Sequence, residues 1–500
     1  MPDRRDALVG YADWLSYGHA ERADAWLARL DVNRPELDAF RAAPSPDAQP
    51  YVPRAADVAT PAAHALAHTP SKLAGADADT ALARARSSHG LNAFTWLADT
   101  PLAAQPGFLH RLPIAVKDLM KVASAPFTAG SRTFEAMTSQ EDAEVVARLR
   151  RHGAAVIGLT NLHELAYGIT SDNPNFGRVV NPVARDRIPG GSSGGSAAAI
   201  AAGVVRAAVG TDTAGSIRIP AACCGIVGFK PSYDALPREG VLDLAPSLDH
   251  VGPMTRDVEG SAALFAAMRG EAGVPAFVRT DMSGTTIGRL RGYFDEPLDR
   301  DVRAALEAAA SALVADGARL VDREIEGIEL APAIQFCTIA PEATAADFDL
   351  LVEGGDRMGE DVRVRLEIGL FLPGAWYAKA QRLRAAFVHA VESAFDDADL
   401  LLCPTLRIPA PPVGAARVDI DGRAYPLHTA VTQLTMPFNL SGLPAISVPW
   451  SRSRDGVPIS LQLVAPRGAD WRVLAAAQRL QALAPWRADG KQRARDRAGL

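Results

Sequence analysis

The sequence predicts an α/β fold, in which strands of a sheet alternate with helices. Between Leu112 and Pro253, short apolar runs of strand length alternate with helix-like segments and glycine-rich turns, as in sheets built from strands and crossovers. The runs are PIAV, AAVIGL, VVRAAVG and CCGIVGF. With 500 residues, 48% of them hydrophobic and 22% charged, the chain has the composition of a folded globular protein. At about 150 residues per domain, length alone suggests about three domains.

The first 105 residues differ from this pattern and predict a helical N-terminal layer. They are rich in Ala, Arg, Asp and Leu, and apolar residues recur there at helical spacing, at Ala23, Trp26, Leu27 and Leu30. Prolines break the stretch from 44 to 61, which predicts a loop within this layer.

The chain beyond Thr285 continues the α/β pattern. RGYF, the helically spaced residues 301–316 and RLVDREI predict a strand, a helix and a strand. The Ala-, Leu- and Arg-rich residues 359–395 predict helix. LLCPT and PAISVP predict two late strands, and residues 470–483 predict a terminal helix.

Charge and cysteine content exclude several classes of protein. The 52 basic and 58 acidic residues give a net charge of −6, so no net attraction draws the chain to nucleic acid or to an anionic membrane. Four cysteines without CxxC spacing predict neither a disulfide framework nor a zinc site. No secretory signal and no transmembrane stretch is visible. We therefore expect a cytoplasmic protein in a reducing compartment.

A glycine- and serine-rich loop, PGGSSGGSAAAIAAG at residues 189–203, precedes an alanine-rich helix. Such a loop can direct backbone N–H groups at an anion or oxyanion. A phosphate-binding loop would need a lysine near its end, which is missing. Gly190 to Gly194 match the G-x-S-x-G elbow of α/β hydrolases, but the charged VARDRIP replaces the buried strand that an elbow requires. A purely structural turn is the remaining alternative.

Two further segments carry residues suited to catalysis. GTDTAGSIRIPAACCGIVGFKP, residues 210–231, contains a turn of small residues that leads to Ser216. Upstream, Lys117 directly follows the apolar run Ile114–Val116, where a lysine at a strand end can be drawn into the interior. An isolated lysine in such a place is commonly a surface residue whose apolar stem alone is buried.

The motifs PIAVKD, GGSSGGS and GTDTAGSIR together resemble those of the amidase signature family, most densely over residues 112–231. The resemblance extends to SDNPNFGRVVNP and FNLSGLPAISVP. In that family a buried lysine, a serine that follows a cis peptide and a nucleophilic serine 24 residues later form the catalytic triad. Matched by motif, these are Lys117, Ser192 and Ser216, and the spacing 216 − 192 = 24 agrees.

The resemblance also implies an architecture and a class of partner. It implies one large α/β/α domain, residues 106–500, around a mixed twisted sheet flanked by helices, with residues 1–105 packed on the outside. It further implies a small-molecule amide substrate and neither cofactor nor metal. For its assembly, a homodimer is the candidate.

The implied chemistry explains these residue types. Serine is a weak nucleophile until a base takes its proton. No histidine lies in the three motifs, so the base would be neutral Lys117, whose pKa burial must lower by about 3 units. Ser192 would relay the proton from Ser216. The N–H groups of Thr213, Ala214, Gly215 and Ser216 would hold the oxyanion.

Several residues near these motifs invite a second interpretation. Ala214 stands where the family usually has glycine, so its methyl group restricts the oxyanion turn. Asp212 and Arg218 are expected to order that turn. Tyr167 is a candidate for the substrate pocket, and Arg365 lies where glutamine-using relatives supply a carboxylate-binding arginine.

Other candidates favour structural roles. HELAY, residues 163–167, begins like a zinc-binding H-E-x-x-H helix but ends in tyrosine. Trp376 and Tyr377 could line an acyl pocket, although aromatic residues on a helix more often lie in a core. Cys223 and Cys224 are expected to be buried packing thiols.

The first hypothesis for function is a hydrolase that cleaves linear carboxamides through an acyl-enzyme. The alternatives are a glutaminase-type component of an amidotransferase complex, a hydrolase of carbamates or urea derivatives, and a catalytically silent binding protein. TNLHELAYGITSDN, residues 160–173, departs from the TNMDEFAMGSSTE usual in such amidotransferase components, which disfavours the second hypothesis. The intact Lys117, Ser192 and Ser216 argue against the last.

Overall fold

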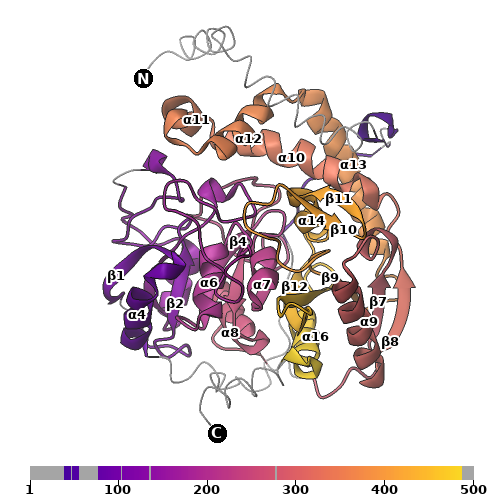
Figure 1. Ribbon diagram of the computed structural model, residues 1–500, viewed down its shortest axis with the longest axis horizontal. Coiled ribbons are helices and arrows are strands. Elements are labelled where there is room, and N and C mark those ends of the chain that lie inside the picture. Colours follow the sequence, from indigo (N-terminus) through magenta and orange to yellow (C-terminus); the bar gives the residue numbers. More distant parts are fainter. Residues whose placement is uncertain are drawn as a thin grey trace.

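One mixed sheet of eleven strands organises the protein. The computed structural model describes residues 39–44, 46, 48–55, 77–102, 104–134, 137–275 and 279–486. Within these residues the strand order is β1-β3-β2-β4-β6-β5-β12-β13-β9-β7-β8. Figure 1 shows the sheet crossing the molecule from β1 at the left to β8 at the right. The predicted α/β fold with a mixed central sheet is confirmed.

Two groups of parallel strands are joined by antiparallel ones. The pairs β2–β3, β2–β4, β7–β8 and β7–β9 are parallel, and the other pairs of this sheet are antiparallel. The strands are β1 Phe94–Leu102, β2 Pro113–Lys117, β3 Ala155–Thr160, β4 Ala207–Asp212, β5 Val227–Lys230, β6 His250–Thr255, β7 Thr286–Leu290, β8 Arg319–Arg323, β9 Leu400–Pro404, β12 Ala445–Arg452 and β13 Pro458–Val464. A separate hairpin joins β10 Arg417–Ile420 to β11 Arg423–Pro426.

Helices cover both faces of the sheet. One face packs against α5 Glu144–Arg151, α8 Val258–Arg269, α9 Arg300–Ala315 and α16 Asp470–Leu483, and the other against α4 Ala78–Ser87, α6 Gly194–Ala201 and α7 Arg218–Cys224. A further group gathers along the top of Figure 1: α10 Ala331–Ala346, α11 Phe348–Gly354, α12 Glu360–Phe371 and α13 Gly374–Ser393. Two short helices, α14 Leu427–Thr432 and α15 Pro437–Leu440, precede β12.

The alternation of side chains along β2 explains where Lys117 lies. Ile114 and Val116 belong to the larger hydrophobic core on the face of α5 and α8, whereas Ala115 belongs to the core on the face of α6. Because successive strand residues face opposite sides, Lys117 follows Ala115 toward α6. The α6 side is built largely from alanines, which let this helix approach the sheet closely.

Most predicted elements are present at their expected places. The strands at 401–405 and 444–449, the helices over 301–316 and 359–395 and the terminal helix 470–483 are confirmed. The strand expected at RGYF lies just before it, at Thr286–Leu290, because RGYF itself forms a 3₁₀ turn. β6 and β13 were not predicted.

The predicted N-terminal helical layer, residues 1–105, needs one correction. Much of it lies outside the described residues. Within them α4 is helical, but β1 is an edge strand that pairs with β3, so residues 94–102 belong to the sheet. The reason is the run FTWLADTPL, whose β-branched and aromatic residues suit a half-buried strand. The domain boundary near residue 105 stays a prediction. No helix in the described part of the chain has the length and apolar character needed to cross a bilayer.

Candidate active site

Lys117, at the end of β2, is fully buried and bonded to two hydroxyl groups. Its Nζ donates to Ser192 Oγ at 2.8 Å and to Thr211 Oγ1 at 2.7 Å. Burial lowers the pKa of Lys117 to about 7, even though the negative charges of Asp249 and Asp212 favour the ammonium form. The lysine is therefore neutral in a substantial fraction of molecules near neutral pH.

Ser192 is held on the glycine-rich loop by contacts to its backbone. The Gly191–Ser192 peptide is cis. The Ser192 carbonyl accepts hydrogen bonds from His163 N (3.1 Å) and from Ser171 Oγ (3.3 Å), and Ser171 Oγ also donates to the Gly190 carbonyl at 2.9 Å. Since the carbonyl oxygens on both sides of Gly191 are bound, the loop has a fixed position and the Ser192 side chain points at Lys117.

The turn from Thr213 to Ser216 follows β4. Thr213 Oγ1 donates to Asp249 Oδ1 at 2.6 Å, and the Ala214 carbonyl accepts from Thr435 Oγ1 at 2.6 Å. The left-handed φ of this turn, +134°, falls on Gly215, where an added Cβ would lie 2.3 Å from Thr435 Oγ1. The turn therefore requires glycine at 215, and the methyl group of Ala214 occupies a position that an L-residue adopts normally.

The backbone of this turn carries a row of donors. In the described part of the chain, no protein atom accepts a hydrogen bond from the N–H groups of Thr213, Ala214, Gly215 or Ser216. Such donors on a fixed turn are available to a bound oxyanion.

Asp212 and Arg218 form a buried ion pair next to the turn. Arg218 Nη2 lies 2.9 Å from Asp212 Oδ1, and both side chains are fully buried. Burial by itself would raise the pKa of Asp212, but the charge of Arg218 outweighs it and holds that pKa well below its usual range. Arg218 also donates to the Thr435 carbonyl (2.9 Å) and to Asn439 Oδ1 (2.7 Å). The pair thus ties the turn to the segment 435–439, as expected for an ordering role.

Ser216 lies on the wall of a cavity of about 300 Å³. Its backbone carbonyl accepts a hydrogen bond from Ser193 N at 3.3 Å, which places the two serine motifs side by side. Thr213, Ala214 and Tyr167 also line the cavity, whereas Lys117 and Ser192 are fully buried and do not. A ligand in the cavity would therefore contact the turn and Tyr167, whereas Lys117 does not border the cavity.

Arg365, which the family resemblance suggested as a carboxylate-binding residue, lines the same cavity from α12. Its Nη1 donates to Asp361 Oδ2 at 2.7 Å and to the Tyr167 carbonyl at 3.0 Å. Trp376 and Tyr377 lie elsewhere: Trp376 packs edge-on against Phe40, and Tyr377 donates to Glu342.

The remaining candidates have structural partners. His163 Nε2 lies 2.9 Å from Asp361 Oδ2, so the HELAY segment joins the wall beside Arg365. Cys223 and Cys224 are buried, and burial raises the pKa of the Cys223 thiol to about 12. Both cysteines therefore remain protonated packing residues.

Three residues that contact the site were not predicted from the sequence. Thr211 is the second partner of Lys117, and Ser171 fixes the serine loop. Asp249 binds Thr213 and also accepts from Leu244 N (2.8 Å) and Ala245 N (2.9 Å). Of these, Ser171 and Thr211 lie within segments that carry the family resemblance, which was their available signal. Asp249 lies 36 residues from its partner Thr213, and no local pattern marks it.

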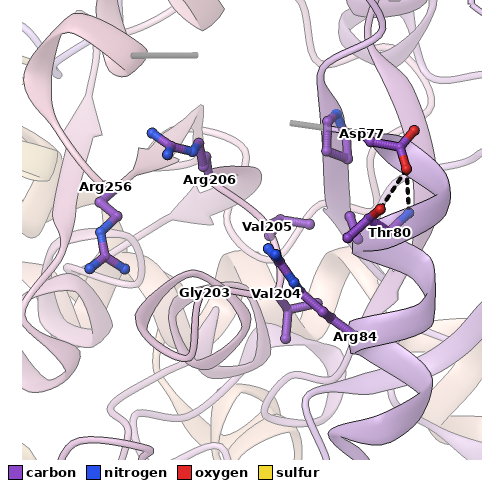
Figure 2. Close-up of a pocket in the computed structure, with 10 residues that line it drawn as sticks. Asp77, Thr80, Arg84, Gly203, Val204, Val205, Arg206 and Arg256 are labelled. Carbon is purple, nitrogen blue, oxygen red and sulfur yellow. Dashed lines mark hydrogen bonds between the residues drawn. The ribbon is translucent and has the colours of Figure 1, made fainter. Parts of the chain in front are cut away.

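A second cavity, of about 380 Å³, lies beside α4, at residues distant from this site. It is lined by Asp77, Thr80, Arg84, Gly203, Val204, Val205, Arg206 and Arg256, among others, and by none of the predicted site residues. Figure 2 shows that Asp77 is engaged in capping α4 through Thr80, while the arginine side chains point in different directions. Among the described residues that line it there is no serine, cysteine, histidine or lysine.

Comparison with known proteins agrees with this geometry. A profile of the family described as Amidase matches residues 67–474. The chain is 36% identical over 373 residues to AtzE, a 1-carboxybiuret hydrolase component of Pseudomonas sp. (strain ADP), covering 71% of this chain and 80% of that protein. It is 35% identical over 415 residues to the A component of the glutamyl-tRNA(Gln) amidotransferase of Geotalea daltonii, covering 76% and 84%.

Solved structures give the same result. A crystal structure of an amidase superposes with a TM-score of 0.76 at 34% identity, covering 81% of this chain and 95% of that one. The family match, residues 67–474, spans the sheet and the predicted site residues. The chain therefore belongs to the Amidase family, and it is an amidase signature enzyme that hydrolyses amide bonds.

Proposed function

We propose that this enzyme cleaves a carboxamide to a carboxylic acid plus ammonia or an amine, through an acyl-enzyme on Ser216. The observation that carries the proposal is that the three residues differ in their access to the cavity. Ser216 lines the cavity, whereas Ser192 and Lys117 are fully buried and joined by a 2.8 Å hydrogen bond. The serine loop reaches Ser216 through the bond from Ser193 N to the Ser216 carbonyl. A nucleophile must reach the substrate, whereas its relay and base need only reach the nucleophile.

In the acylation step, Ser216 Oγ attacks the amide carbon and forms a new C–O bond. The Ser216 proton passes to Ser192 Oγ, and Ser192 gives its own proton to Lys117 Nζ. Collapse of the tetrahedral intermediate breaks the C–N bond. The leaving nitrogen takes a proton back along the same relay, which returns Lys117 to its neutral form.

Deacylation repeats these proton transfers with water. Water attacks the ester carbon as Ser192 and Lys117 accept its proton, and the C–O bond to Ser216 then breaks. Ser216 regains a proton and the acid leaves. Each half-reaction begins and ends with a neutral lysine, so a pKa of about 7 suits the base to work near neutral pH.

The oxyanion of each intermediate would be held by the N–H groups of residues 213–216. Supporting this role, these donors have no acceptor within the described residues, and the turn is fixed by Asp249 and Thr435. Donors held in place before the reaction stabilise developing charge without reorganising, typically by about 3 kcal/mol per donor.

Two alternatives come from the names of the relatives. The match to an amidotransferase component favours a glutaminase that hands ammonia to a partner, and the match to a 1-carboxybiuret hydrolase component favours a urea-like substrate. Gel filtration of the purified protein, with analysis of co-purifying chains, would separate a stand-alone enzyme or homodimer from a partner-dependent component. A panel of linear amides, anilides, carbamates and ureas would order the substrates.

The nucleophile is tested by trapping. A serine-directed phosphonate followed by peptide mapping should label Ser216, and Ser216→Ala should lose about 10³-fold or more in kcat. Label confined to Ser192 in a protein whose Ser216→Ala variant stays active would favour the hydrolase-elbow interpretation instead.

A further inference from the structure

The cavity that Ser216 faces is lined largely by apolar side chains, with Arg365 and His428 as its basic residues. Apolar side chains come from several segments around it: Ile169, Leu244, Phe336, Ile339, Ile368 and Met436. Among the described residues that line it, Arg365 is the only arginine, lysine, aspartate or glutamate. What the cavity selects therefore depends on whether the Arg365 charge is available to a ligand.

That charge is already compensated by the protein. Asp361, one turn earlier on α12, lies 2.7 Å from Arg365 Nη1. The same carboxylate accepts from His163, whose side chain is 4% exposed. Burial alone would raise the pKa of Asp361, but the bonds from His163 and the charge of Arg365 hold that pKa well below its usual range. Asp361 is therefore ionised at neutral pH.

The position of the Arg365 guanidinium is also fixed. Its Nη1 donates to the Tyr167 carbonyl at 3.0 Å, and the guanidinium lies 5.9 Å from the centre of the Tyr167 ring. An anionic ligand at this wall would gain the attraction of Arg365 and meet the repulsion of Asp361. An apolar ligand meets neither, and it gains the free energy of leaving water.

We propose that the acyl group taken by this site is uncharged and largely apolar, and that Asp361 determines this specificity by neutralising Arg365. The inference rests on the proposed function, because it concerns the acyl side of the same amide. A cavity of about 300 Å³ suits a short aliphatic or a single-ring acyl group.

The test compares two amides of equal chain length. Pentanamide ends in a methyl group and glutaramate, the monoamide of glutaric acid, ends in a carboxylate. The wild type should prefer pentanamide by about tenfold or more in kcat/KM, because Arg365 is already paired with Asp361 and gives the carboxylate of glutaramate little net attraction. Asp361→Asn keeps an oxygen that accepts from Arg365 but removes the charge, so it should raise the ratio of kcat/KM for glutaramate to kcat/KM for pentanamide by about tenfold.

Matched variants separate this effect from a change in helix charge. Glu360, the neighbouring residue of α12, is exposed, and Glu360→Gln removes the same charge without touching Arg365. It should leave both substrates within about twofold of wild type. In Asp361→Asn/Arg365→Gln the gain for glutaramate should disappear. If Asp361→Asn does not fold, Arg365→Gln alone decides: a masked arginine leaves the substrate ratio nearly unchanged, whereas a carboxylate anchor loses glutaramate selectively.

Failure of this inference is distinguishable from failure of the proposed function. A wild type that prefers glutaramate, or an unchanged ratio in Asp361→Asn, overturns the role of Asp361 while amide hydrolysis stands. If neither amide is turned over and the phosphonate does not label Ser216, the proposed function fails. Calorimetric dissociation constants of the two amides for Ser216→Ala still decide the preference in that case.

Discussion

Lys117 Nζ and Ser192 Oγ lie 2.8 Å apart, and the solvent reaches neither side chain. An ammonium group in this position would carry its charge without contact with water. Burial therefore favours the neutral amine and lowers the pKa of Lys117 to about 7. The burial that disfavours the charged form of Lys117 thus makes the residue a candidate base.

The first prediction concerns pH. Only the neutral lysine can accept a proton, so kcat/KM for a neutral amide should rise with pH through about 7 and then level off. Initial rates between pH 5.5 and 9, at constant ionic strength, measure this limb. A flat profile across pH 7 would contradict the assignment.

A carboxyl group could produce a similar limb, because burial raises the pKa of Asp249 to about 7. Temperature separates the two groups. Ionisation of an ammonium has a large enthalpy and that of a carboxyl a small one, so a lysine limb moves to lower pH on warming. A limb that stays in place would belong to a buried carboxyl group, Asp249 or Asp347, whose pKa burial also raises to about 7.

The second prediction concerns Lys117→Arg. This variant keeps the charge and nearly the length, but a guanidinium with a pKa above about 12 does not release its proton. It should be nearly inactive on amides while remaining folded by circular dichroism. Lys117→Ala should be comparably poor and regain some rate at high pH, where hydroxide replaces the base. Substantial turnover by folded Lys117→Arg would remove the lysine from the base role.

The third prediction treats Asp212 and Arg218 as a structural pair. Arg218→Met leaves a fully buried carboxylate without its counter-charge, so the free energy of unfolding should fall by about 3–5 kcal/mol. Urea unfolding measures the loss. Arg454→Met is the control, since Arg454 is 62% exposed in its pair with Asp301, and such surface pairs contribute about 1 kcal/mol or less. Equal midpoints for the two variants would refute a structural role for the buried pair.

The fourth prediction tests how Thr213 positions the oxyanion turn. Thr213→Val keeps the shape but removes the hydroxyl that donates to Asp249. We expect kcat to fall by about tenfold with KM nearly unchanged, because a hydrogen bond to a carboxylate contributes about 1.5–3 kcal/mol. Thr213→Ser restores the hydroxyl and should recover most of the rate. If Thr213→Val and Thr213→Ser behave alike, the bond does not position the turn.

The fifth prediction concerns the N-terminal layer. A chain that lacks residues 1–105 loses β1 and α4, and with them the strand that pairs with β3 and the helix that covers it. It should be insoluble or inactive, because the exposed edge of β3 would invite aggregation. Expression, gel filtration and an amide assay measure the outcome. A soluble and fully active fragment would show that residue 105 marks a true domain linker.

Most strands of the sheet and the candidate residues of the site follow from the local sequence. PIAV, AAVIGL and the other apolar runs became strands of the sheet because strand length and apolar character are properties of a few neighbouring residues. Ser192 and Ser216 were identified through the resemblance of short motifs to those of the amidase signature family, and such motifs are likewise properties of neighbouring residues. Lys117 was less certain on its own, because a strand end does not say how deeply its side chain is buried.

The surroundings of these residues depend on how the whole chain folds. The tertiary structure set the depth of Lys117 and thus its pKa, and it paired Thr213 with Asp249 and Arg365 with Asp361 in one site. It also gathered residues from 166 to 436 around one cavity. Thr213 and Asp249 lie 36 residues apart, and no local pattern encodes their meeting. Asp361 and Arg365 are one turn apart on α12, but their contact with Tyr167 and the cavity depends on how α12 packs. Their positions follow from how helices and strands pack together, and the electrostatics of the site depends on that packing.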